Sequence, residues 1–268
     1  MAGPIPDDRI IHHARIIAAV FVNHFFTFGF IYSFGVFVPA LKSHFGASLA
    51  EAAAANSTMV AMQFVGSLAA GLLLQAQRLG HRAIAAGGAL LCCAGFSAAS
   101  VAGRLSGVYA CVSVAGIGLG ACNMAGLASL NGQVRKRRAL AVGLATCGTS
   151  VGTIVQPVVL TAIIDAWGWR PALLAIAAVG GGALLATAPP LAGLDGLPPP
   201  PGAPAGRRVC ASLWRQLPCA DARYACWWAS VVLCFLGYFA PVTLLAEFAR
   251  AELRASPAAS AGAYTTMG

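Results

Sequence analysis

Charged residues are scarce in this chain, and acidic residues are the scarcer kind. Only 9% of its 268 residues are charged, whereas soluble domains carry about 25%. Aspartate and glutamate number 8 against 17 lysines and arginines, and 59% of all residues are hydrophobic. A globular surface in water needs more charge than this composition supplies. The scarcity excludes an ordinary soluble domain and predicts a polytopic membrane protein.

Paired metal-binding motifs are also lacking. The 9 cysteines include no Cys-x-x-Cys pair. Most of them stand inside apolar runs, where cysteine serves as a small hydrophobic residue. These seven are Cys92, Cys93, Cys111, Cys122, Cys147, Cys226 and Cys234. We therefore expect no metal site, no cofactor and no disulfide framework.

A patch for nucleic acid is not indicated either, although the formal net charge is +9. Surfaces that bind phosphate backbones gather their cations on a soluble face. Here the cations stand between apolar segments. The excess of positive charge therefore predicts contact with a lipid bilayer and no nucleic-acid partner.

What the chain has in abundance is apolar segments long enough to cross a membrane, which takes roughly 20 helical residues. The first is longer than the apolar core of a signal peptide, so we expect it to be retained. The seven segments are 16–41, 52–74, 83–102, 108–130, 139–164, 172–191 and 225–245. Together they predict an all-α bundle of transmembrane helices.

The same segments divide the chain into four parts. Residues 1–15 form a short polar N-terminus, and residues 16–192 a six-helix transmembrane half. Residues 193–222 are rich in proline and arginine, with four consecutive prolines from Pro198 to Pro201, which favours an extended linker. Residues 223–268 begin a second transmembrane half with the seventh helix.

The distribution of cations between alternate loops predicts the orientation, because arginine and lysine near spans stay on the cytoplasmic side. Twelve of the 17 lie on the side of the N-terminus: Arg9, Arg15, Arg78, Arg82, Arg135, Lys136, Arg137, Arg138, Arg207, Arg208, Arg215 and Arg223. The other five are Lys42, Arg104, Arg170, Arg250 and Arg254. We therefore expect a cytoplasmic N-terminus.

The junction after Arg138 is the most informative stretch. Four consecutive cations, residues 135–138, meet a segment without an ionised residue until Asp165. Within it Gly143, Gly148 and Gly152 recur every four or five residues, a spacing that lays small residues along one helix face. The pattern predicts a helix that starts at the cytoplasmic surface and packs closely against a neighbour.

This junction resembles the fifth-helix signature of the monocarboxylate transporter family of the major facilitator superfamily, Arg-Arg-Pro-Leu-Ala-x-Gly-x-Ala-x-Ala-Gly-x-x-x-Gly. Ala139 replaces the proline of that signature, and Cys147 replaces its second alanine. The positions that agree after the basic pair are Leu140, Ala141, Gly143, Ala145, Gly148 and Gly152. The resemblance implies a bundle of twelve helices, of which this chain holds about seven.

Other segments carry the same resemblance. Residues 77–82 are similar to the superfamily's cytoplasmic loop Asp-Arg-x-Gly-x-Arg, with Gln77 at the position of the aspartate and Gly80 expected to make the tight turn. Gly116 and Gly118 match a Gly-x-Gly of the fourth helix, which predicts close helix packing. By this resemblance the cytoplasmic gate consists of Arg78, Gly80, Arg82, Arg137 and Arg138.

Polar residues within the spans are the candidates for a substrate and proton path, because polar groups in lipid are expensive and face the bundle. His24 has two interpretations, a group that carries protons and a structural residue bonded to a neighbouring helix. The candidates are Asn23, His24, Tyr32, Gln63, Asn123 and Gln156.

By resemblance, the chain is no enzyme but part of a secondary transporter that moves lactate-like or pyruvate-like monocarboxylates together with a proton, by alternating access in the plasma membrane. Its partners would be a small organic anion, a proton and the bilayer, with an accessory membrane subunit left open. An oxalate or sugar-acid transporter and a non-transporting seven-helix membrane protein are the alternatives. Because an odd set of seven spans leaves the second half incomplete, we expect a fragment.

Overall fold

The computed structural model describes residues 7–134, 137–195, 226, 229–230 and 233–234. Within these residues every regular element is a helix, and there is no strand. Six of the helices are long and apolar enough to cross a membrane. The predicted first six spans thus appear as helices, whereas the seventh span, at 225–245, lies almost entirely outside the described residues. So do Arg135, Lys136 and the linker beyond residue 195.

The first span is a continuous helix that changes type along its length. It consists of α1 (Asp7–Ser33), the 3-10 helix η1 (Phe34–Phe37) and α2 (Val38–Phe45). The second, third, fourth and fifth spans are α3 (Leu49–Gln75), α4 (His81–Ser100), α5 (Leu105–Gln133) and α6 (Arg138–Trp167). The sixth consists of α7 (Trp169–Ala175), the π-helix η2 (Ile176–Gly180), α8 (Gly181–Ala186) and the 3-10 helix η3 (Pro189–Leu194).

Local sequence sets where these helices begin and end. Gly46 ends α2 in the left-handed conformation, with φ of 62°, which glycine adopts without a steric penalty. Ser48 then opens α3 with a capping box, in which its hydroxyl oxygen accepts from the amide of Glu51 and the Glu51 carboxylate accepts from the amide of Ser48. Gly168, with φ of 87°, separates α6 from α7.

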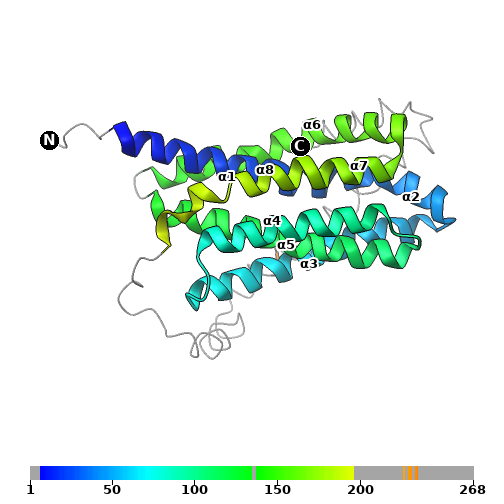
Figure 1. Cartoon of the computed structure of the whole chain (residues 1–268), viewed down its shortest axis with the longest axis horizontal. Helices are drawn as coiled ribbons and strands as arrows, with labels where there is room; N and C mark the ends of the chain where they lie inside the picture. Colours follow the sequence, from blue (N-terminus) through cyan, green and yellow to red (C-terminus); the bar gives the residue numbers. More distant parts are fainter. Residues whose placement is uncertain (1–6, 135–136, 196–225, 227–228, 231–232, 235–268) are drawn as a thin grey trace.

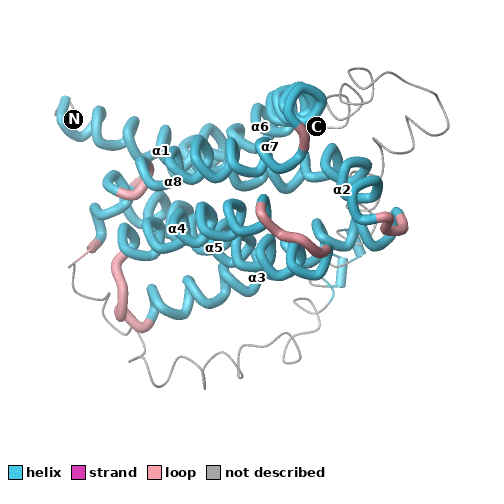
Figure 2. Tube along the Cα trace, turned by 45° about the vertical axis from the view of Figure 1, so that its right-hand side comes forward, coloured by secondary structure: helices cyan, strands magenta, loops and turns pink. Residues whose placement is uncertain are grey.

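The six spans form two layers, which can be followed in Figures 1 and 2. One layer contains α1, α6 and the sixth span, and the other contains α3, α4 and α5. Within the layers α1 packs along α6, while α5 packs between α3 and α4. Contacts of α1 with α5 and of α4 with α8 join the two layers.

Glycines make these helix pairs close. A Cβ on Gly116 would overlap the Met59 carbonyl oxygen of α3, and a Cβ on Gly118 would overlap the Gly88 carbonyl oxygen of α4. Gly148 lies in the same way against the backbone of Phe21 in α1. In membranes such close backbone approach supplies the packing that the hydrophobic effect cannot.

The predicted glycine stripe of α6 needs one correction. Gly148 and Gly152 both lie against the backbone of α1, at Phe21 and Phe25 respectively. Gly143 is exposed, and nothing among the described residues would lie within 4 Å of a Cβ there. An α-helix turns about 100° per residue, so residues four apart, such as Gly148 and Gly152, lie on nearly the same face. Gly143 precedes Gly148 by five residues and therefore points in a different direction. Gly143 therefore does not share the contact with α1.

Candidate functional site

The first group of predicted path residues lies where α1 meets α5. Asn23 is 1% exposed, and its side-chain amide donates a hydrogen bond of 2.8 Å to the Cys122 carbonyl oxygen. Its Oδ1 accepts from the hydroxyl of Thr27 at 3.1 Å. Asn23 thus joins two helices, and Thr27, which the sequence analysis did not select, belongs to the same polar group.

His24, one residue further along α1, has a different environment. It is 3% exposed, and its Nδ1 lies 2.9 Å from the Val20 carbonyl oxygen of its own helix. Because a carbonyl only accepts, the proton of a neutral His24 stands on Nδ1, and Nε2 keeps its lone pair. The His24 ring lies 5.4 Å from that of Phe28, which in turn stacks on Tyr32 at 6.3 Å. His24, Phe28 and Tyr32 form a continuous ring stripe along α1.

Gln156 fastens α6 to α1. Its side-chain amide donates a 2.7 Å hydrogen bond to the Phe25 carbonyl oxygen, close to Gly29 and Gly152. Pro157 follows inside the helix, where it removes one backbone donor. In this conformation Gln156 joins two helices, and its place on a substrate and proton path stays a prediction.

Gln63 and Asn123 come from α3 and α5, the most extensively packed pair of helices. Gln63 is 3% exposed, and its backbone lies against Gly116 and Gly120. Asn123 is half-buried, and its Oδ1 is enclosed without a hydrogen-bond partner among the described residues. An unpaired buried oxygen is costly, so Asn123 is the path candidate whose acceptor the described protein leaves unused.

The predicted gate loop has its left-handed residue in an unexpected place. Gln77 has φ of 52°, whereas Gly80 has φ of −75° and ψ of 164°, an extended conformation open to any residue. Arg78 and Arg82 are exposed. The expectation that Gly80 makes the tight turn is wrong, and its lack of a side chain has another reason.

That reason is Asp195, a residue that the sequence analysis did not select. A Cβ on Gly80 would lie 2.5 Å from the carboxyl carbon of Asp195. The carboxylate accepts from the amides of His81 at 2.6 Å and Arg82 at 3.2 Å, and lies 3.0 Å from the His81 ring Nδ1. The sequence does mark Asp195 in one way, because it is the single acidic residue between Asp165 and Asp221.

The second basic group of the predicted gate stands at the start of α6. Arg137 is the residue before the helix and has φ of 54°. The Arg138 side chain donates through Nε to the Asn131 side-chain oxygen near the end of α5, at 2.8 Å. Both arginines are exposed. They lie where α6 begins, and their place at the cytoplasmic surface stays a prediction.

No group of three or more His, Cys, Asp or Glu suited to a metal ion occurs in the part of the chain that the structure describes. In the described spans every lysine and arginine lies near a helix end. His24 is the one His, Asp or Glu away from the ends of these spans. The membrane interior of this half therefore offers hydrogen-bond donors, acceptors and one imidazole.

Comparison with curated proteins gives two informative relatives. The chain is 31% identical over 244 residues to monocarboxylate transporter 3 of Rattus norvegicus, covering 88% of this chain and 48% of that protein. It is 30% identical over 165 residues to monocarboxylate transporter 11 of Homo sapiens, covering 61% of this chain and 35% of that protein. The chain thus spans about half the length of rat monocarboxylate transporter 3 and a smaller share of human monocarboxylate transporter 11.

Solved structures share the fold. A peptide transporter POT in complex with alafosfalin superposes with a TM-score of 0.59 at 18% identity, covering 88% of this chain and 52% of that one. The sequence model of the Major Facilitator Superfamily matches residues 20–268. Because that match takes in nearly the whole sequence, the chain belongs to the Major Facilitator Superfamily.

Proposed function

We propose that this chain forms the first six helices, and the start of the second half, of a secondary transporter for small monocarboxylates such as lactate and pyruvate. The observation that carries the proposal is the 31% identity to rat monocarboxylate transporter 3 over 88% of this chain. Transport would proceed by alternating access, in which two halves rock about a site at mid-membrane. This chain spans 48% of that relative. The proposed transporter therefore includes further helices that complete the second half.

The arrangement of polar groups agrees with such a substrate. A carboxylate that leaves water needs a cation or several hydrogen-bond donors, because an unpaired charge in low dielectric is prohibitive. The described spans hold their lysines and arginines at the helix ends, so this half contributes polar contacts and no permanent cation at mid-membrane. Asn123, with its unpaired oxygen, would accept a hydrogen bond from a substrate hydroxyl or a protonated carboxyl.

Coupling to a proton is assigned to His24. The hydrogen bond from Nδ1 to Val20 fixes the ring and directs the basic Nε2 away from its own helix backbone. A proton on Nε2 would create a mid-membrane cation that attracts a carboxylate, and release of the substrate would favour release of the proton. The alternative, a purely structural His24, predicts the same burial but no effect on coupling.

The proposed setting is the plasma membrane, with the N-terminus and the loops around Gly80 and Arg138 in the cytoplasm. The twelve-to-five distribution of cations supports this orientation. A transporter for oxalate or sugar acids is the second candidate, because the unpaired Asn123 oxygen would accept a hydrogen bond from a sugar-acid hydroxyl equally well. Whether an accessory membrane subunit takes part is left open by this proposal.

Uptake measurements would test the function. Residues 1–268 joined to the last five helices of rat monocarboxylate transporter 3 should give saturable uptake of labelled lactate and pyruvate into vesicles, stimulated by an inward proton gradient. The 268-residue chain alone serves as the control and should give none, since a site between two halves needs both. Uptake of oxalate without lactate would favour the second candidate, and normal insertion without any uptake would contradict a transport function.

A further inference from the structure

The carboxylate of Asp195 stands at the N-terminus of α4. Both of its oxygens are engaged there, Oδ1 by the backbone amide and ring of His81 and Oδ2 by the amide of Arg82. The first amides of a helix have no partner within the helix and carry its positive dipole end, so an anion is favoured there. Gly80, the residue before α4, has no side chain that could accept hydrogen bonds from these amides. Asp195 therefore caps a helix that lies more than a hundred positions earlier in the sequence.

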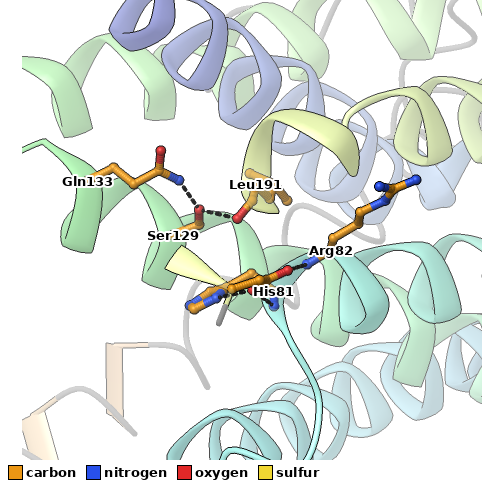
Figure 3. A network of polar contacts seen from close by, with 6 residues as sticks. His81, Arg82, Ser129, Gln133 and Leu191 are labelled. Atoms are coloured by element: carbon orange, nitrogen blue, oxygen red, sulfur yellow. Dashed lines mark hydrogen bonds and ion pairs between the residues drawn. The ribbon is translucent and has the colours of Figure 1, made fainter. Parts of the chain in front are cut away.

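The end of the sixth span is held at further points beside this cap. The Ser129 hydroxyl of α5 donates to the Leu191 carbonyl oxygen at 2.8 Å and accepts from the Gln133 side-chain amide at 2.7 Å. Figure 3 shows these contacts beside His81 and Arg82. Leu191 is 0% exposed. A Cβ on Gly193 would overlap the Gln133 side-chain oxygen, so the backbone at Gly193 packs directly against the Gln133 side chain of α5.

We propose that Asp195 is a positioning residue of the cytoplasmic gate. It supplies from the end of the sixth span the carboxylate that the loop lacks at Gln77, and it fastens η3 and the Gly80 loop into one unit. Gly80 is then required because the Asp195 carboxylate occupies the place of a side chain. The role in gating rests on the proposed transport function, whereas the anchoring contact does not.

Disulfide formation between Gly132→Cys and Leu194→Cys, in a chain without its native cysteines, measures the anchoring directly. A Cβ on Gly132 would lie 3.4 Å from the Leu194 Cγ and would overlap a terminal methyl group that Leu194→Cys removes. The Cγ of Leu194 marks roughly where the Sγ of Leu194→Cys would stand, so the two cysteine side chains lie within reach of each other for a disulfide. Oxidation of the two introduced cysteines to a disulfide should therefore be fast in membranes that contain this chain with Asp195 unsubstituted.

Asp195→Ala should lower the equilibrium constant for docking of this segment by between about twofold and thirtyfold, the range expected when a helix loses its N-cap, and should slow cross-linking accordingly. Asp195→Asn should retain most of the cross-linking rate, because asparagine caps helices as well as aspartate. Asp165→Ala, which removes an exposed carboxylate at the far end of α6, is the matched control and should have no effect. An unchanged rate in Asp195→Ala would overturn the proposal.

A double-mutant cycle tests the reason for Gly80. Gly80→Ala alone should slow cross-linking as Asp195→Ala does, because the added methyl group displaces the carboxylate while the backbone conformation remains allowed. In the Asp195→Ala background the same change should be nearly neutral. Additive effects of the two substitutions would overturn the assignment.

The gating role is tested in the chimera once its uptake of lactate has been established. Asp195→Ala should lower uptake at unchanged surface abundance, and Asp195→Asn should restore most of it. Unchanged uptake in Asp195→Ala, alongside slowed cross-linking, would overturn the gating role while leaving the transport function intact.

Discussion

Two neighbouring residues of α1, Asn23 and His24, are both polar and both buried, yet they differ in what they bind. Asn23 satisfies its amide and its carbonyl oxygen within the protein, through Cys122 and Thr27. His24 uses one ring nitrogen within its own helix. Burial is the same for both residues, and their hydrogen-bond partners are what differ.

Asn23→Leu should destabilise the six-helix half by ~1 kcal/mol, because it removes an interhelical hydrogen bond and leaves the Thr27 hydroxyl without its acceptor. Asn123→Leu is the matched control. Its oxygen has no partner among the described residues, so no hydrogen bond made through that oxygen is lost there. Thermal unfolding in detergent would measure both, and equal losses of stability would contradict the distinction.

His24→Gln should remove the stimulation of lactate uptake by an inward proton gradient in the chimera, because glutamine cannot take up the proton. Uptake driven by the lactate gradient alone should persist at a reduced rate. The comparison requires equal surface abundance, which can be measured on the same vesicles. Full stimulation by the gradient in His24→Gln would leave His24 a structural residue.

Helix pairing depends on where small residues stand along each helix. In α6, Gly148 and Gly152 bring the backbone of α1 close enough for Gln156 to reach the Phe25 carbonyl oxygen. A larger residue at either glycine would separate the two helices and break that bond. The contact between α1 and α6 is therefore one unit made of backbone packing and a side-chain hydrogen bond.

Gly148→Leu should lower the amount of folded 268-residue chain in the membrane, since overpacking of a close contact costs about 1–3 kcal/mol. Gly143→Leu makes the same chemical change on the same helix, where a Cβ meets nothing among the described residues. Its abundance should stay near that of the unsubstituted chain. Quantitative immunoblots of membrane fractions, with resistance to trypsin, would measure both, and equal losses would refute the packing argument.

The whole molecule has two chemically different ends. At one end lie the Gly80 loop, the turn before α6 and the cap formed by Asp195. At the other end Arg170 donates to the Ala102 carbonyl oxygen at 3.2 Å and its guanidinium lies 5.2 Å from the centre of the Trp169 ring. Aromatic rings with a nearby cation suit a membrane interface. The alternation of the six spans between these ends follows from the fold, while the orientation in the membrane is a proposal.

Single cysteines at Ser43 and Gln77, in a chain without native cysteines, should differ in labelling by an impermeant thiol reagent added to intact cells. Both positions are exposed, and they stand at opposite ends of the spans. Cysteine at position 43 should label, whereas cysteine at position 77 should label only after the cells are opened. The reverse pattern would invert the proposed orientation.

The amino-acid sequence by itself determined that the chain spans a membrane, how many helices its first half has and approximately where they end. These properties depend on the length of apolar runs and on the charges that interrupt them, so they are written locally along the chain. The glycines at 116, 118, 148 and 152 could also be assigned to helix packing from their spacing. The resemblance at Arg137 to Gly152 was likewise a property of neighbouring residues.

Only the tertiary structure decided which of these residues meet. Asn23 binds a carbonyl 99 residues away, Gln156 one 131 residues away, and Asp195 caps a helix whose first residue lies 114 positions earlier. Hydropathy and spacing do not encode how each helix is rotated about its axis or which helix it pairs with. For this reason the sequence predicts Gly143 on the wrong face and predicts at Gly80 a turn that Gln77 makes. The carboxylate that lies against Gly80 is apparent only in three dimensions.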